Sequence, residues 1–134
     1  MSEQSYTKVR DVMTPDPTVI DRLASVEHAI ELMRKNNVSS LVIERRQEGD
    51  EYGMVTVHDI AGSVLARNRS TERTSVYEIM SKPVLSVDVN MDIKYAMRLL
   101  TRFRLNRALV TDQGAMVGIV TLRDMTLRYS AKPT

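Results

Sequence analysis

Two stretches of the chain carry apolar residues at positions i, i+3, i+4 and i+7, the spacing of a helix with one buried face. Each stretch follows a polar residue that can cap a helix N-terminus. The apolar positions are Val26, Ala29, Ile30 and Met33 behind the cap Ser25, and Ile93, Ala96, Met97 and Leu100 behind the cap Asp92. Asn37 can end the first helix in a left-handed conformation, whereas Arg104 at the matching place leaves the second helix end less clear.

Short runs of β-branched and aliphatic residues flank both helices and predict strands. The runs PTVID and PVLSVD precede the helices, SLVIE and GMVTV follow the first helix, and ALVTD and GIVTL follow the second. The turn RRQEGDEY is long and charged and should be solvated, whereas DQGA predicts a tight hairpin. A final helix is expected over DIAGSVLARN and again over DMTLRYSA. The order β-α-β-β-α therefore occurs twice.

The amino-acid sequence repeats as well as the order of predicted helices and strands. VRDVMT at Val9–Thr14 matches VYEIMS at Val76–Ser81 at an offset of 67, and GMVTVHD at Gly53–Asp59 matches GIVTLRD at Gly118–Asp124 at an offset of 65. Self-similarity that keeps its register predicts a duplicated unit. We expect one repeat at 9–68 and a second at 76–130, with an N-terminal tail at 1–8 and a polar linker at 69–75.

Composition narrows the class of protein. The 134 residues are 43% hydrophobic and 27% charged, which is typical of a globular protein. No cysteine is present, which excludes disulfides and thiolate metal sites and favours a reducing, cytoplasmic location. No apolar run is long enough to cross a membrane, and a net charge of +2 makes nucleic acid an unlikely partner. The two histidines, His28 and His58, have no partners at metal-ligand spacing, so no metal site is expected.

The repeated phrase Gly-h-h-Thr-x-x-Asp, where h is apolar, has two interpretations. Thr56 with Asp59, and Thr121 with Asp124, form the pattern of a capping box at a helix start, with the glycine serving the turn into the strand. The same residues suit a ribonucleotide, because a helix N-terminus attracts phosphate and a carboxylate accepts two hydrogen bonds from a ribose diol. The spacing leaves both interpretations open.

Taken together, these motifs resemble a tandem pair of CBS domains, a Bateman module named after cystathionine β-synthase. The resemblance rests on DVMT and EIMS, the helix residues Ala29 and Ala96, VSSLVI and NRALV, and both repeated phrases, and it covers about Val9–Tyr129. It implies a mixed α/β (α+β) fold of two pseudo-symmetric β-α-β-β-α repeats with packed sheets. It also implies two clefts that bind an adenosine-containing ligand, most simply AMP, ADP or ATP, with S-adenosylmethionine or NAD(H) as further candidates.

The resemblance also assigns residues to the clefts, each of which takes its Thr and Asp from one repeat and its base-enclosing segments from the other. One cleft would use Thr121 and Asp124 with Val12, Met13, Thr18, Val19, Val38 and Ser39. The second cleft would use Thr56 and Asp59 with Ile79, Met80, Leu85, Leu105 and Asn106. Arg107 occupies a phosphate-binding position of some family members, Ser40 takes its place in the first repeat, and His58 and Arg123 can also reach phosphate. We therefore expect the Asp59 cleft to carry more positive charge for the phosphate of a nucleotide.

The sequence thus predicts a regulatory module that senses an adenine nucleotide and acts on a separate effector protein. The alternative is a structural or interaction module with empty clefts. An enzyme is not expected, because no nucleophile motif, phosphate loop or metal constellation is present. We further expect a homodimer of four repeats, built on the apolar face of the final helices. The face would comprise Ile60, Val64 and Leu65 in one repeat and Met125 and Leu127 in the other.

Overall fold

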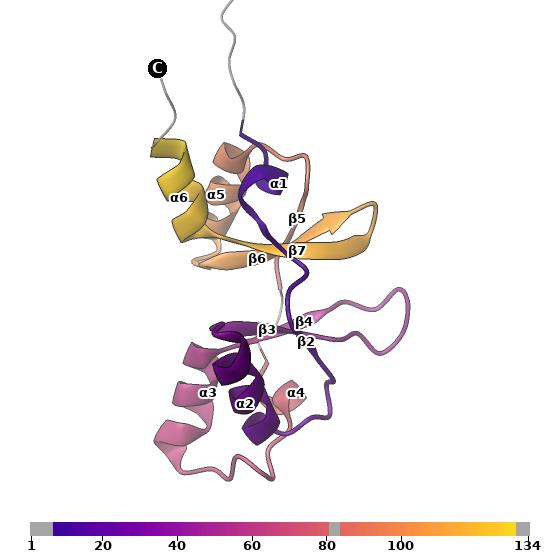
Figure 1. Cartoon of the computed structure of the whole chain (residues 1–134), viewed down its shortest axis with the longest axis vertical. Helices are drawn as coiled ribbons and strands as arrows, with labels where there is room; N and C mark the ends of the chain where they lie inside the picture. Colours follow the sequence, from indigo (N-terminus) through magenta and orange to yellow (C-terminus); the bar gives the residue numbers. More distant parts are fainter. Residues whose placement is uncertain (1–6, 81–83, 131–134) are drawn as a thin grey trace, which may run out of the picture. The chain divides into compact units, whose positions relative to one another are not determined.

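The computed structural model describes residues 7–80 and 84–130, and the chain divides into two compact units (Figure 1). Unit 1 joins the N-terminal segment up to Pro17 to the residues from Leu85 onward, and unit 2 spans Thr18–Val84. The prediction of a mixed α/β fold is confirmed, since the described residues form two sheets and six α-helices. Residues 1–6 of the predicted tail and Pro83 of the predicted extended run lie outside the described residues.

Unit 2 is a three-stranded sheet with helices packed on one face. Its elements are β2 Val19–Ile20, α2 Val26–Asn36, β3 Ser40–Ile43, β4 Gly53–Thr56, α3 Val57–Ser63, a 3-10 helix Leu65–Arg67 and α4 Val76–Ile79. Strand β3 lies between β2, which is parallel to it, and β4, which is antiparallel. Alternate residues of the sheet, Leu41, Ile43 and Val55, join the core formed with the helices.

Unit 1 repeats this arrangement with one more strand. Its elements are α1 Val9–Val12, β1 Thr14–Pro15, β5 Ser86–Asp88, α5 Ile93–Arg102, β6 Arg107–Asp112, β7 Ala115–Thr121 and α6 Leu122–Ser130. The sheet order is β1-β7-β6-β5, with only β5 and β6 parallel. The predicted hairpin is present, because Asp112 pairs with Ala115 and the two residues between them both have positive φ, 53° at Gln113 and 87° at Gly114.

The predicted N-caps of α2 and α5 are confirmed, and the two helices are followed by a residue of the same backbone conformation. The Ser25 side chain accepts a hydrogen bond from the backbone N–H of His28, and Asp92 accepts one from Lys94. Asn37 adopts the predicted left-handed conformation, with φ of 53°, and so does Arg104, with φ of 59°. The side chain of Arg104 did not predict this, since a left-handed conformation is costly for a residue other than glycine or asparagine.

Each repeat sends its opening motif into the unit built by the other. In unit 1, the backbone N–H of Val9 donates to the carbonyl of Met91 at 2.8 Å, ahead of α5. In unit 2, the N–H of Val76 donates to the carbonyl of Ala24 at 2.9 Å, at the equivalent place ahead of α2. Both valines are fully buried. The compact units therefore exchange segments relative to the sequence repeats.

The residues predicted to form an apolar docking face divide into two kinds. Ile60, Val64 and Met125 are at most 3% exposed and belong to the cores, so their assignment to an exposed face was wrong. Leu65 and Leu127 are about half exposed. Over the residues that the structure describes, no helix is long and apolar enough to cross a membrane.

Candidate functional site

The repeated phrase places a threonine and an aspartate at the junction between a strand and the helix that follows it. In unit 2, Thr56 ends β4 and caps α3. The Thr56 Oγ1 accepts a hydrogen bond from the N–H of Asp59 at 3.1 Å, and the Asp59 carboxylate accepts from the Thr56 N–H at 2.9 Å and from its hydroxyl at 3.0 Å. The capping box predicted from the sequence is therefore complete in this unit.

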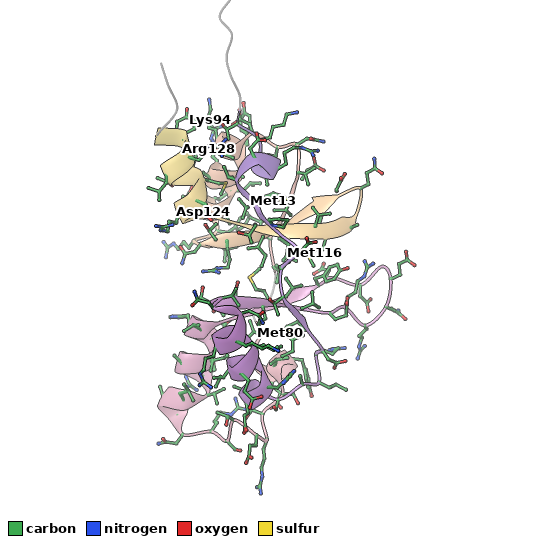
Figure 2. The ribbon with its side chains drawn as sticks, viewed as in Figure 1. Met13, Met80, Lys94, Met116, Asp124 and Arg128 are labelled. Atoms are coloured by element: carbon green, nitrogen blue, oxygen red, sulfur yellow. The ribbon has the colours of Figure 1, made fainter. Side chains whose placement is uncertain are left out.

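In unit 1 the same box is only half made. The Thr121 Oγ1 accepts from the N–H of Asp124 at 3.0 Å, as in the other unit. The Asp124 carboxylate instead meets the Arg123 guanidinium at 3.4 Å, in a pair whose side chains are 78% and 40% exposed. Figure 2 shows Asp124 at the end of α6 nearest the sheet. Because exposed ion pairs are weak, the Asp124 carboxylate is held less firmly than that of Asp59.

The residue across the sheet from each threonine decides the charge of the site. Arg107 on β6 is the register partner of Thr121, whereas Ser40 on β3 is the partner of Thr56. Arg107 and Asp59 lie in different units, so the predicted grouping of these two residues stays a prediction. The better charged group is the one around Asp124.

The segments before these strands also belong with the phrase of their own unit. The carbonyl of Asn106 accepts from the N–H of Leu122 at 2.7 Å, and the carbonyl of Ser39 accepts from that of Val57 at 3.0 Å. The predicted grouping of Ser39 with Asp124 and of Asn106 with Asp59 joins residues of different units and stays a prediction. We define the Asp124 group as Asn106, Arg107, Thr121, Arg123 and Asp124, and the Asp59 group as Ser39, Ser40, Thr56, His58 and Asp59.

The exchanged segments bring a methionine against the glycine of each phrase. A Cβ at Gly118 would lie 2.9 Å from the Met13 Sδ and 2.7 Å from the carbonyl oxygen of Thr14. A Cβ at Gly53 would lie 2.6 Å from the Met80 Sδ. Neither glycine has a positive φ, so both are required by close packing and not by the turn that the sequence suggested.

The other predicted site residues divide between those that lie in the same unit as their aspartate and those that lie in the other unit. Val12 and Met13 share unit 1 with Asp124, and Ile79 and Met80 share unit 2 with Asp59. The carbonyls of Thr18 and Leu85 occupy equivalent places, since Thr18 accepts from Val42 of β3 and Leu85 accepts from Leu109 of β6. The predicted contacts that share no unit with their aspartate are Thr18, Val19, Val38 and Ser39 for Asp124, and Leu85, Leu105 and Asn106 for Asp59.

The two groups therefore offer different chemistry. The Asp124 group combines a carboxylate, the Arg123 guanidinium 3.4 Å from it and Arg107 on the strand position opposite Thr121, which suits a ligand with both a phosphate and a diol. The Asp59 group has a serine in the place of Arg107, and its carboxylate is engaged by Thr56. Among the described side chains, no cluster of three or more His, Asp or Glu residues is placed to hold a metal ion.

Comparison with known proteins assigns both repeats to one family. The family model of the CBS domain matches residues 9–66 and again residues 76–130. The CBS domain-containing protein YhcV of Bacillus subtilis is 31% identical over 121 residues, which cover 90% of this chain and 84% of YhcV. Two further relatives are longer, and the chain spans 57% and 44% of their lengths.

Solved structures share the fold over nearly the whole chain. The hexameric CBS-CP12 protein from bloom-forming cyanobacteria is 30% identical, with a TM-score of 0.90, and the match covers 98% of this chain and 78% of that one. The CBS domain pair of protein MJ0100, solved with 5-methylthioadenosine and S-adenosyl-L-methionine, is 24% identical with a TM-score of 0.82. That match covers 96% of this chain and 100% of the MJ0100 pair.

Proposed function

The chain belongs to the CBS domain family, and from this premise we propose that it is a regulatory module whose Asp124 group binds an adenosine-containing ligand. The ligand is AMP, ADP or ATP in the first instance, with S-adenosylmethionine and NAD(H) as the alternatives to be tested. Ligand binding controls a separate effector protein, and the module carries out no catalysis itself. The complex of the MJ0100 pair with two adenosine compounds supports this ligand class.

The observation that carries the proposal is the pairing of Arg107 with Thr121 across β6 and β7. This register places a permanent positive charge next to a helix N-terminus, where the backbone N–H groups already favour an anion. Arg123 adds a second guanidinium beside Asp124. A nucleotide would set its phosphate against the arginines and its ribose diol against the carboxylate.

The Asp59 group supports the second candidate, a structural role. Both hydrogen bonds from Thr56 go to the Asp59 Oδ2, so this carboxylate already serves the start of α3. Ser40 provides no charge for a phosphate. We therefore propose an asymmetric module, in which the Asp124 group binds ligand and the Asp59 group stabilises the start of α3.

A thermal-shift panel with AMP, ADP, ATP, S-adenosylmethionine and NADH tests the ligand class. A ligand held only by the folded protein must raise its melting temperature. Calorimetry on the best ligand then compares Asp124→Asn with Asp59→Asn as the matched control. Hydrogen bonds to a charged group contribute about 1.5–3 kcal/mol each, so we expect Asp124→Asn to lose at least ~10-fold in affinity. Asp59→Asn should lose less than about threefold. The proposal fails if the protein responds to none of these ligands, or if both variants bind with the affinity of the wild type. Helix capping would then be the role of both groups.

Self-association as a homodimer of four repeats is part of the same proposal. The relative CBS-CP12 protein is hexameric. The described residues also expose large apolar side chains on both units, among them Leu65 and Leu127, and exposed apolar patches commonly mark interfaces.

A further inference from the structure

Unit 2 has an open hollow at the end of its sheet away from the Asp59 group. Two adjoining cavities, of about 480 Å³ and about 510 Å³, have four lining residues in common, which are Arg22, Glu44, Arg45 and Arg46. These residues follow the last residues of β2 and β3, whereas the first residue of β3 pairs with Thr56. The two cavities form one continuous depression, which we call the arginine hollow. Its further lining residues are Asp21, Leu23, Ile43, Asp50, Glu51, Gly53, Tyr77 and Met80.

The three arginines of the hollow are held against aromatic rings and not against carboxylates. Arg22 lies 5.5 Å from the ring centre of Tyr77, and Arg45 lies 4.9 Å from that of Tyr52. Both are half-buried, and Arg46 is exposed. In the described part of the chain, none of the three forms an ion pair. Because a guanidinium that stacks on a ring keeps the N–H donors along its edge, these groups are available to an anion from outside the unit.

The carboxylates of the hollow restrict the kind of anion that fits. The Asp21 carboxylate accepts a hydrogen bond from the backbone N–H two residues later at 2.8 Å, and that of Glu44 accepts from the N–H of the next residue at 3.1 Å. Asp50 and Glu51 add two further negative charges to the lining. A long polyanion, such as nucleic acid or polyphosphate, would be repelled by these groups. A ligand with only one or two carboxylates meets the arginines with much less repulsion.

Two large apolar side chains line the same cavity as the arginines. Leu23 is 69% exposed and Tyr77 is 41% exposed. Protein interfaces are enriched in aromatic residues and arginine, which combine apolar area with directed hydrogen bonds. A ligand that matches this surface therefore carries an apolar side chain next to its carboxylates, as a segment of a protein does.

The other repeat shows that the shared fold does not require these exposed side chains. At the offset of 67 residues, Leu23 corresponds to Asn90 and Tyr77 corresponds to Arg10. In unit 1 the two matching side chains bind each other, because the Arg10 guanidinium donates to the Asn90 Oδ1 at 2.8 Å. The loop that carries Arg46 also differs, since it projects from the sheet between β3 and β4 (Figure 1) and is longer than the two-residue turn between β6 and β7. The arginine hollow is therefore a feature of unit 2 that folding alone does not explain.

We propose that the arginine hollow binds a short peptide segment of a partner protein, in which one or two carboxylates lie next to an apolar side chain. The carboxylates accept hydrogen bonds from Arg22, Arg45 and Arg46, whose fork of donors matches a carboxylate. The apolar side chain packs on Leu23 and Tyr77. This surface serves the separate effector protein of the proposed function, and in that respect the inference rests on it. The identity of the nucleotide does not enter, and no residue of the hollow belongs to the Asp124 group.

Selection from a random-peptide display library on the purified chain tests the proposal without assuming a partner. We expect the enriched peptides to share a glutamate or aspartate beside an apolar residue. The affinity of a labelled copy of the most enriched peptide is then measured by fluorescence anisotropy. Arg46→Glu should weaken this peptide at least ~10-fold, because it replaces a donor with a repelling charge. The matched control is Arg73→Glu, which reverses an exposed arginine of the same unit outside the hollow and should change the affinity less than about threefold.

Leu23→Ser tests the apolar half of the contact and should weaken the same peptide about fivefold or more. The Leu23 side chain is largely exposed, so the melting temperature should not fall, and this measurement shows that the variant folds. An enriched set without acidic residues, or a peptide that binds Arg46→Glu or Leu23→Ser as tightly as the wild type, would overturn the proposal. Displacement of the peptide by an equal concentration of tripolyphosphate would show a general anion site and overturn it too. AMP affinity of both variants, measured alongside, keeps this result separate from the nucleotide proposal.

Discussion

The substitution Gly118→Ala tests the close packing between the N-terminal segment and β7. A methyl group added there would lie 2.7 Å from the Thr14 carbonyl oxygen, whereas a carbon and an oxygen approach to only about 3.3 Å even in favourable contacts. Strand β1 would have to move by about 0.6 Å, and it is paired directly to β7 through Pro15 and Gly118. Overpacking of this kind costs about 1–3 kcal/mol. We therefore expect Gly118→Ala to lower the melting temperature by about 8 °C for a loss of 2 kcal/mol.

Gly53 is the matched control, because its obstacle can move. The added methyl would meet the Met80 Sδ at 2.6 Å, and a methionine side chain has three rotatable bonds with which to withdraw. Gly53→Ala should cost less than about 1 kcal/mol. A Gly53→Ala, Met80→Ala double variant should remove the closest contact and leave the methyl 3.3 Å from the Ile43 Cβ, whereas Met13→Ala should not rescue Gly118→Ala. Thermal and urea denaturation of the variants measures the difference. Equal stability of Gly118→Ala and wild type, or a larger loss in Gly53→Ala, would refute this reasoning.

Three smaller effects on stability follow from the local geometry. Asp59→Ala should destabilise the protein by about 1 kcal/mol more than Asp124→Ala in urea denaturation, because only Asp59 completes its capping box; equal losses would contradict this. Arg104→Gly should raise the free energy of unfolding by about 1 kcal/mol, because Arg104 has a φ of 59°, and a loss of stability would show that its side chain matters more. Gly114→Ala should lower the melting temperature, since Gly114 has a φ of 87° in the β6–β7 turn, and no change would indicate a different turn.

The regular elements could be predicted because their signals are local. The apolar stripes behind Ser25 and Asp92 and the hairpin turn at Gln113 depend on neighbouring residues only. Helices α1 and α4, each of four residues, were not predicted, because one turn is too short to show a helical period. The structure holds them by hydrogen bonds to the unit of the other repeat, such as that from Val9 to Met91. Such long-range contacts leave no periodic trace in the sequence.

The membership of the candidate site depended on strand register, which the sequence did not reveal. Counted back from the tight turn between Asp112 and Ala115, a regular hairpin would pair Arg107 with Val120. A bulge after Val110 shifts the register by one residue and sets Arg107 opposite Thr121. The sequence already joined Thr121, Arg123 and Asp124 in one motif, but the pairing of Arg107 with Thr121 depends on this single irregularity.

The most direct test of the account is the affinity of the Arg107→Ala variant for AMP and for adenosine, measured by calorimetry beside the wild type. Arg102→Ala is the control, because it removes an exposed guanidinium from α5 outside the Asp124 group. If Arg107 holds the phosphate, its loss should weaken AMP at least ~10-fold, since a charge-assisted hydrogen bond contributes about 1.5–3 kcal/mol. Adenosine has no phosphate, so its affinity should be unchanged, which also shows that the variant is folded. Equal effects on AMP and adenosine, or an AMP affinity that survives Arg107→Ala, would contradict the assignment of the ligand to the Asp124 group.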